Sequence, residues 1–195
     1  MHAIAVSKSL WWYTARAGGL TAWWLVALTV FWGLMLSTRV TRGKPTPAWL
    51  LDLHRFMGGL AVIFTVVHIA GLMGDKWIKL QVADLLIPMH AKFKPGALAW
   101  GVIAVYLMVA IELTSLFMKH LPRKLWRAIH STAFALFLMT TVHAFAAGSE
   151  NKNVAVQWTA LSFAAIFTFL MVYRAFLPRR FRLLNGQFPD APALG

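Results

Sequence analysis

The sequence predicts an all-α membrane protein, a bundle of five transmembrane helices, from its apolar content, its apolar runs and the placement of its charges. Of the 195 residues, 59% are hydrophobic and 13% are charged, whereas soluble domains are about 45–50% apolar. Five apolar runs have roughly the 20 residues that a helix needs to cross a bilayer. The 19 Lys and Arg residues cluster between these runs, as membrane topology requires. The net charge of +13 therefore indicates a lipid bilayer as partner and no nucleic acid.

The five spans are expected at about residues 20–38, 51–73, 97–118, 125–147 and 155–176. Each must be helical, because a lipid-exposed segment has to satisfy its own backbone hydrogen bonds. The longest connection, from Gly74 to Pro95, is too apolar for a free loop and is expected to form a cap on the outer surface. Residues 1–19 are expected to form an N-terminal interfacial segment, residues 20–177 the transmembrane bundle, and residues 178–195 a basic cytoplasmic tail.

Basic residues predict how this multi-pass bundle is oriented in the plasma (cytoplasmic) membrane. Twelve of the 19 cations fall on one side, which the positive-inside rule assigns to the cytoplasm. They are Arg39, Arg42, Lys44, Arg55, Lys119, Arg123, Lys124, Arg127, Arg174, Arg179, Arg180 and Arg182. The N-terminus is then outside and the C-terminus is cytoplasmic. In this orientation the second and fourth spans both run from inside to outside and are parallel.

Four histidines occupy these two parallel spans. Because an ionisable side chain is costly inside a membrane, their presence there indicates a function. His54 and His68 are 14 residues apart, and His130 and His143 are 13 apart, which corresponds to roughly 21 Å and 19.5 Å along a helix. His54 thus lies at the depth of His130, and His68 at the depth of His143. A pair of neutral imidazoles from facing helices can hold a six-coordinate haem iron. The spacing predicts two haems, stacked across the membrane.

The 14-residue and 13-residue intervals place the second histidine at different angles around the helix axis. Fourteen residues end about 40° short of four turns, whereas thirteen end about 140° short. We therefore expect a local distortion, such as a bulge or a kink, in the fourth span.

Other residues carry weaker predictions. Arg55 and Arg127 are expected to meet the propionates of the inner haem, while Glu112, an acid well inside the third span, suggests a pair with Arg127 or a proton role. The sequence contains no cysteine, which excludes covalent haem attachment, thiolate metal sites and iron–sulfur clusters. Small residues beside the histidines of the second span would leave room for a flat macrocycle; they are Gly58, Gly59 and Gly71.

Several segments together resemble the ferric-reductase-like transmembrane domain, a superfamily that includes ferric reductases, the transmembrane part of NADPH oxidases and the haem subunit of the methionine-sulfoxide reductase system. The segments are Leu53-His54-Arg55-Phe56-Met57-Gly58, His68, Leu125-Trp126-Arg127-Ala128-Ile129-His130 and His143-Ala144-Phe145-Ala146-Ala147-Gly148. The resemblance covers about residues 20–176. It implies two haem b groups, their iron bound as metal by His54 with His130 and by His68 with His143.

The expected function is that of a membrane di-haem cytochrome b, an oxidoreductase component that transfers electrons from a cytoplasmic-side donor to an extracytoplasmic acceptor. Ferric reductases usually continue into a flavin- and NADPH-binding domain, and this sequence ends at residue 195. The expected donor is therefore a separate flavoprotein reductase or a quinol. Two alternatives stay open: a haem-bearing anchor subunit of a larger redox complex, and a non-redox transporter that uses His and Glu112 for protons or metal. No catalytic residue is predicted.

Overall fold

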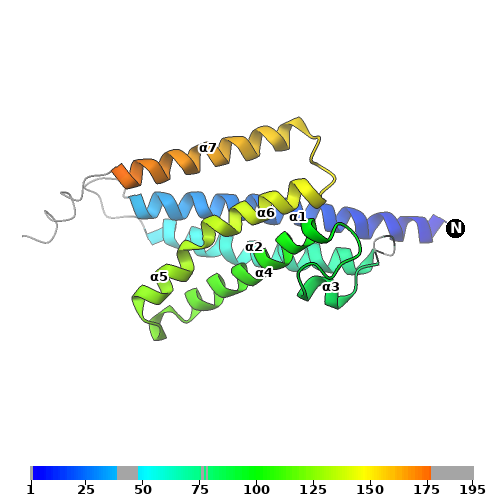
Figure 1. Cartoon of the computed structure of the whole chain (residues 1–195), viewed down its shortest axis with the longest axis horizontal. Helices are drawn as coiled ribbons and strands as arrows, with labels where there is room; N and C mark the ends of the chain where they lie inside the picture. The colour runs from blue at the N-terminus through cyan, green and yellow to red at the C-terminus, as the bar shows by residue number, and fades with distance from the viewer. Residues whose placement is uncertain (1, 39–47, 76, 78, 177–195) are drawn as a thin grey trace, which may run out of the picture.

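The computed structural model describes residues 2–38, 48–75, 77 and 79–176, and within them all regular structure is helical. The elements are α1 (His2–Thr38), α2 (Ala48–Gly74), α3 (Val82–Leu86), α4 (Pro95–Leu116), the 3-10 turn η1 (Met118–His120), α5 (Arg123–Ser131), α6 (Ala133–Ala147) and α7 (Val154–Phe176). The long helices lie roughly along one direction, with α7 beside α1 (Figure 1). The predicted basic tail and most of the first basic connection lie outside the described residues.

Five helical segments are long and apolar enough to cross a membrane, which confirms the predicted number of spans. They are Leu10–Ser37, Ala48–Gly74, Pro95–Leu116, Arg123–Ala147 and Val154–Tyr173. The last four begin and end within three residues of the predicted bounds. The first differs, because α1 is one continuous helix from His2 and its apolar stretch begins ten residues before the expected position.

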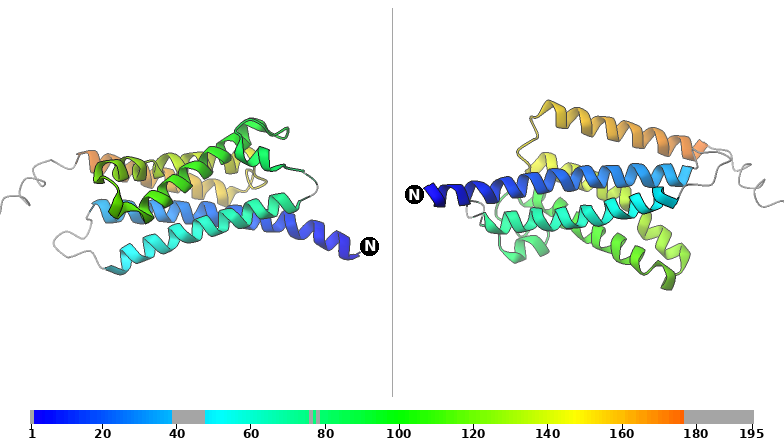
Figure 2. Two further views of the ribbon diagram at one scale, coloured as in Figure 1. Left: turned by 90° about the horizontal axis from the view of Figure 1, so that it is seen from below. Right: turned by 180° about the vertical axis from the view of Figure 1, so that it is seen from behind.

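A glycine pair lies inside α1 at the place where the start of the first span was expected. Gly18 and Gly19 face α2, and a Cβ atom on Gly18 would lie 3.0 Å from the backbone nitrogen of His68. Opposite them, a Cβ on Gly71 would lie 2.5 Å from the backbone nitrogen of Ala15. Glycine here permits close helix packing, as in many membrane bundles. Helices α1 and α2 are accordingly in contact along most of their length (Figure 2).

The core forms where α1 meets the other spans. Trp23 of α1 is 3% exposed, and its indole N–H donates to the Thr141 hydroxyl at 2.9 Å. Its ring stacks on Phe137 of α6 at 6.5 Å between centroids. The buried residues of this cluster are Trp23, Val26, Ala27, Val30, Leu34, Ala61, Ala104, Met108, Ile111, Leu136, Phe137, Ala160 and Phe167.

Large apolar side chains also cover the outside of the bundle. Leu138 of α6 and Leu161 and Phe169 of α7 are each 60% exposed or more. Surfaces of this kind are stable against lipid rather than water. With five candidate spans, they make the chain a multi-pass membrane protein.

The connection between α2 and α4 forms the ordered cap that its apolar sequence suggests. Asp84 is 9% exposed; its carboxylate accepts the Gln81 backbone N–H at 2.8 Å and lies 2.7 Å from Nδ1 of His90. These bonds lower the pKa of Asp84, first through the backbone N–H and then through His90. The Tyr106 hydroxyl of α4 donates to the Leu86 carbonyl, so the cap is fastened to the bundle.

Candidate functional site

The structure brings the four predicted histidines together in two pairs. His54 of α2 and His130 of α5 form the first pair, with ring centroids 6.0 Å apart. His68 of α2 and His143 of α6 form the second pair, with centroids 6.4 Å apart. All four side chains are half-buried. The pairing makes α2 parallel to α5 and α6, as the charge pattern predicted.

The distances within the pairs suit a shared metal ion. Two imidazoles bonded to one metal at about 2.0 Å, with each centroid about 1.1 Å behind its nitrogen, have centroids roughly 6.2 Å apart. The observed distances of 6.0 and 6.4 Å lie on either side of this value. The rings of each pair are edge-on, with 66° and 80° between their planes, and so are not packed face to face. The two pairs therefore have the separation of bis-imidazole metal sites.

The distortion expected in the fourth span is confirmed, and it lies between the two histidines of that span. Helix α5 ends at Ser131 and α6 begins at Ala133. At Thr132 the backbone N–H and the hydroxyl both donate to the Ile129 carbonyl, at 3.0 and 2.6 Å. Such bonding three residues back tightens and bends a helix. His130 thus sits on its own short helix, and the 13-residue interval no longer prevents both rings from facing α2.

In the second pair, backbone carbonyls fix both rings. Nδ1 of His68 lies 2.6 Å from the Ala15 carbonyl oxygen of α1, and Nδ1 of His143 lies 2.8 Å from the Ala97 carbonyl oxygen of α4. A carbonyl only accepts hydrogen bonds, so each Nδ1 carries the proton and each Nε2 keeps its lone pair. This is the arrangement that orients histidine ligands in metal proteins.

In the first pair, the support is less uniform. Nδ1 of His54 lies 3.1 Å from the Thr29 carbonyl oxygen of α1. Nδ1 of His130 lies 3.3 Å from the Ser115 hydroxyl of α4. Because a hydroxyl can donate or accept, Ser115 permits either tautomer of His130.

Glycines opposite the rings make room for three of the histidines. A Cβ on Gly19 would lie 2.7 Å from Nδ1 of His68, and a Cβ on Gly101 would lie 2.7 Å from Nδ1 of His143. A Cβ on Gly33 would lie 3.2 Å from the ring of His54. Sequence reasoning missed these glycines, although Gly19 and Gly33 are 14 residues apart, the same spacing as His54 and His68.

The glycines that sequence reasoning did select have other surroundings. Gly71 packs against α1, and Gly58 lies against the Glu112 carboxylate, where a Cβ would be 2.8 Å from Oε1. Gly59 faces open space. Glu112 is therefore next to α2, and no ion pair joins it to Arg127 among the described residues.

Arg55 and Arg127 lie at the end of the bundle that holds the first pair. Arg55 follows His54 directly, and its exposed guanidinium is 3.9 Å from the Asp52 carboxylate. Arg127 is exposed on α5, one turn before His130. Their contact with a haem propionate stays a prediction.

A buried indole N–H at the first pair was also missed. Trp126 stacks on His130 with 5.1 Å between centroids. Its Nε1 is buried and has no hydrogen-bond acceptor in the described residues. Leaving such a donor unpaired costs about 1–3 kcal/mol. A ligand with acceptor oxygens would satisfy it, as the propionates of a haem do.

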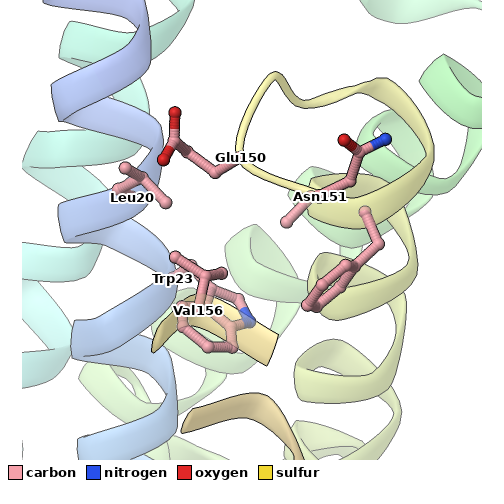
Figure 3. A pocket seen from close by; sticks show the side chains of 7 residues that line it. Leu20, Trp23, Glu150, Asn151 and Val156 are labelled. Carbon is pink, nitrogen blue, oxygen red and sulfur yellow. The ribbon is translucent and has the colours of Figure 1, made fainter. Parts of the chain in front are cut away.

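A small pocket lies at the other end, beside the second pair. Figure 3 shows Leu20 and Trp23 of α1 together with Glu150, Asn151 and Val156. The Arg16 guanidinium donates to the Glu150 carboxylate and lies over the Trp12 ring. This ion pair ties α1 to the connection between α6 and α7.

Comparison with known proteins identifies one family. The family described as ferric reductase like transmembrane component matches residues 18–141. The match contains His54, His68 and His130 and ends two residues before His143. No match to the chain was found among curated proteins or among solved structures.

Proposed function

We propose, from the premise that the chain belongs to the ferric reductase-like transmembrane component family, that it is a di-haem cytochrome b moving electrons across a membrane. Membership makes the chain a redox component of a transmembrane electron-transfer family. The proposal adds the number of haems, their ligands and the direction of transfer. One observation carries it: two imidazole pairs, each at metal-sharing distance, on helices of a membrane bundle.

The residues of both pairs fit a haem. His54 with His130 would hold one group, and His68 with His143 the other. Helices α2 and α6 have almost no Cα atoms within 8 Å of each other, as expected if a flat group separates them. Bound haem supplies reversible one-electron chemistry at iron.

The polar groups around the first pair would hold and orient its haem. Trp126 would donate its unpaired N–H to a propionate, and Arg55 and Arg127 would neutralise the propionate charge. The hydrogen bonds on Nδ1 would raise the basicity of the imidazole ligands and keep their planes fixed.

The charge pattern sets the direction in this proposal. The N-terminus is outside, the first pair is at the cytoplasmic side, and residues 178–195 form a cytoplasmic tail. Residues 1–19 would extend α1 at the outer surface, and residues 20–177 would form the di-haem bundle. A flavoprotein reductase or a quinol would give electrons to the first pair, and an extracytoplasmic acceptor would take them from the second.

An optical spectrum of the purified chain tests the proposal. Protein made with ample haem is expected to show b-type bands on dithionite reduction, with a pyridine-haemochrome ratio near two per chain. A colourless preparation would overturn the proposal, and proton or metal flux in liposomes would then favour the transporter alternative.

Single cysteines test the orientation, since the chain has no cysteine of its own. Ser149→Cys lies between α6 and α7, and Lys119→Cys lies in η1, at opposite ends of the bundle. In intact cells a membrane-impermeant maleimide should label the first variant and spare the second. The reverse pattern would contradict the proposed direction.

A further inference from the structure

Glu112 is a half-buried carboxylate inside a membrane span. It lies on α4, one turn before the helix ends at Leu116. An ionisable side chain in such a place is costly and is usually kept for a function. None of the ion pairs and hydrogen bonds resolved in the described part of the chain involves its carboxylate. The carboxylate is therefore free to take a proton or a hydrogen bond from a ligand.

The carboxylate lies where α4 faces α2. Contact between α2 and α4 is sparse along their length. Glu112 reaches from α4 to α2, where its Oε1 would be 2.8 Å from a Cβ on Gly58. On α4, exposed apolar side chains stand beside Glu112: Leu113, at 49%, and Leu116, at 74%. We call the strip formed by Gly58, Glu112 and these two leucines the α2–α4 seam.

The seam lies at the level of the first histidine pair. Gly58 is one turn from His54 on α2. Ser115 is nearly one turn from Glu112 on α4 and contacts His130. A ligand in the seam would thus be close to both imidazoles of that pair and open to the lipid on its other side.

We propose that the α2–α4 seam binds a membrane quinol and that Glu112 accepts a proton from its hydroxyl. A quinol combines an apolar body with two O–H donors, which matches an apolar strip holding one unpaired carboxylate. The inference rests on the proposed function, because it names the class of the electron donor.

The reaction balances with the groups named. One quinol loses two O–H protons and two electrons and becomes a quinone. One proton passes to the Glu112 carboxylate and the other to water at the nearby end of the bundle. With haem held at both pairs, the two ferric irons would accept the two electrons, one each.

The other titratable groups on the elements around Glu112 have different roles. On α2 these are His54 and the exposed Asp52 and Arg55, and on α5 they are His130 and the exposed Arg127. In η1 the exposed Lys119 and His120 lie at the end from which a proton would leave. The histidines of the pair would be metal ligands, and Arg55 and Arg127 would neutralise a haem propionate. Asp52 is exposed, so Glu112 is the one half-buried carboxylate at this level of the described bundle.

Anaerobic reduction of the purified full chain by duroquinol tests the proposal. The wild-type rate should rise with pH, because only the ionised carboxylate accepts a proton. Glu112→Gln should be slower on the order of 100-fold and should lose most of that pH dependence, while Glu112→Asp restores part of the rate. Reduction by dithionite should be the same in all three. Asp52→Asn, at an exposed acid on α2, is the charge control.

A pair of glycine variants tests the seam without altering charge. Gly58→Ala places a methyl group against the Glu112 carboxylate and should slow haem reduction by duroquinol several-fold. Gly59→Ala points into open space and should leave the rate unchanged. Equal rates with duroquinol for the wild type, Glu112→Gln and Gly58→Ala would overturn the proposal.

Covalent labelling gives a readout that does not depend on electron transfer. The apolar reagent dicyclohexylcarbodiimide should add to Glu112, and 2-heptyl-4-hydroxyquinoline N-oxide, a quinol analogue, should protect it. If the analogue did not lower the extent of labelling at Glu112, the proposal that the seam is a quinol site would be overturned. If dithionite gave no b-type bands, the proposed function would fail, whereas bands with dithionite and none with duroquinol would overturn this inference alone.

Discussion

In the second histidine pair both Nδ1 atoms meet backbone carbonyls, at 2.6 and 2.8 Å, whereas in the first pair the corresponding distances are 3.1 and 3.3 Å and one partner is a serine hydroxyl. The second pair also has a glycine against each ring. The first pair has only Gly33, at a looser 3.2 Å. The second site is thus held rigidly by the backbone, while the first can adjust its ligands.

Both pairs nevertheless follow one plan, in which a small residue faces the ring and the carbonyl four residues earlier binds Nδ1. Gly19 follows Ala15 by four residues, Gly33 follows Thr29, and Gly101 follows Ala97. A glycine exposes that carbonyl because no Cβ covers it. The plan breaks once, 14 residues after Gly101, where Ser115 stands and offers its own hydroxyl.

The largest expected effect is the selective loss of one haem. His143→Ala should lower the haem content from about two to about one per chain and leave the first site filled. His130→Ala should do the converse. Redox titration shows which component is missing, and His120→Ala, at an exposed residue in η1, is the control. If either variant lost both haems, the two sites would not be independent.

A smaller effect is expected from crowding the rings. In Gly101→Ala the new Cβ would lie 2.7 Å from His143, and misplacing a ligand through such a neighbour costs on the order of 10- to 100-fold in metal affinity. Gly33→Ala should cost less, since the contact there is 3.2 Å. Gly96→Ala, in open space on α4, should bind haem normally. The fraction of haem that each variant retains during gel filtration ranks the three variants. Equal retention by Gly101→Ala and Gly33→Ala would contradict the difference in rigidity between the two sites.

Ser115 offers a way to convert one site toward the other. Ser115→Ala removes the hydroxyl and should weaken the first haem by about tenfold. Ser115→Gly should uncover the Ile111 carbonyl and restore a backbone acceptor for His130, as at the second pair. Low-temperature electron paramagnetic resonance of the ferric protein would report the ligand geometry. Identical spectra for both variants would show that the hydroxyl does not orient His130.

Much of this arrangement could be predicted from sequence because it depends on local patterns. Apolar runs give the five spans, and basic clusters make the second and fourth spans parallel. The mismatch of 13 and 14 residues even predicted a distortion, which the structure places at Thr132. These inferences need only helix geometry and the cost of charge in lipid.

The supports of the rings could not be predicted, because they depend on which helices are neighbours. The spacing of Gly19 and Gly33 is visible in the sequence, but it has meaning only once α1 is known to pack antiparallel on α2. The early start of α1 depends on the same neighbour, since Gly18 packs against α2. The sequence suggested Arg127 as a partner of Glu112, whereas in the structure the Glu112 carboxylate lies against Gly58 of α2.

The smallest expected effect concerns the cap, which is connected to the second pair through the start of α4. The cap leads into Lys94, whose ammonium donates to the Ala146 carbonyl at 3.0 Å, and then into Ala97, which holds His143. Asp84 orders the cap through its ionised carboxylate, whose pKa is lowered by the Gln81 N–H and by His90.

A lowered pKa means that this stabilisation is complete above the ordinary value of about 3.9 and is lost as the pH falls through the lower, folded value. Asp84→Asn should remove it at every pH. Hydrogen exchange should then be faster at the amides of Gln81 and His90, with a slight rise in exchange at the start of α4 and none near His130. Asp52→Asn, which removes only an exposed 3.9 Å ion pair, should change neither. Faster exchange around His130 in Asp84→Asn would show that the cap supports both pairs, and the contrast between them would then lie in the glycines alone.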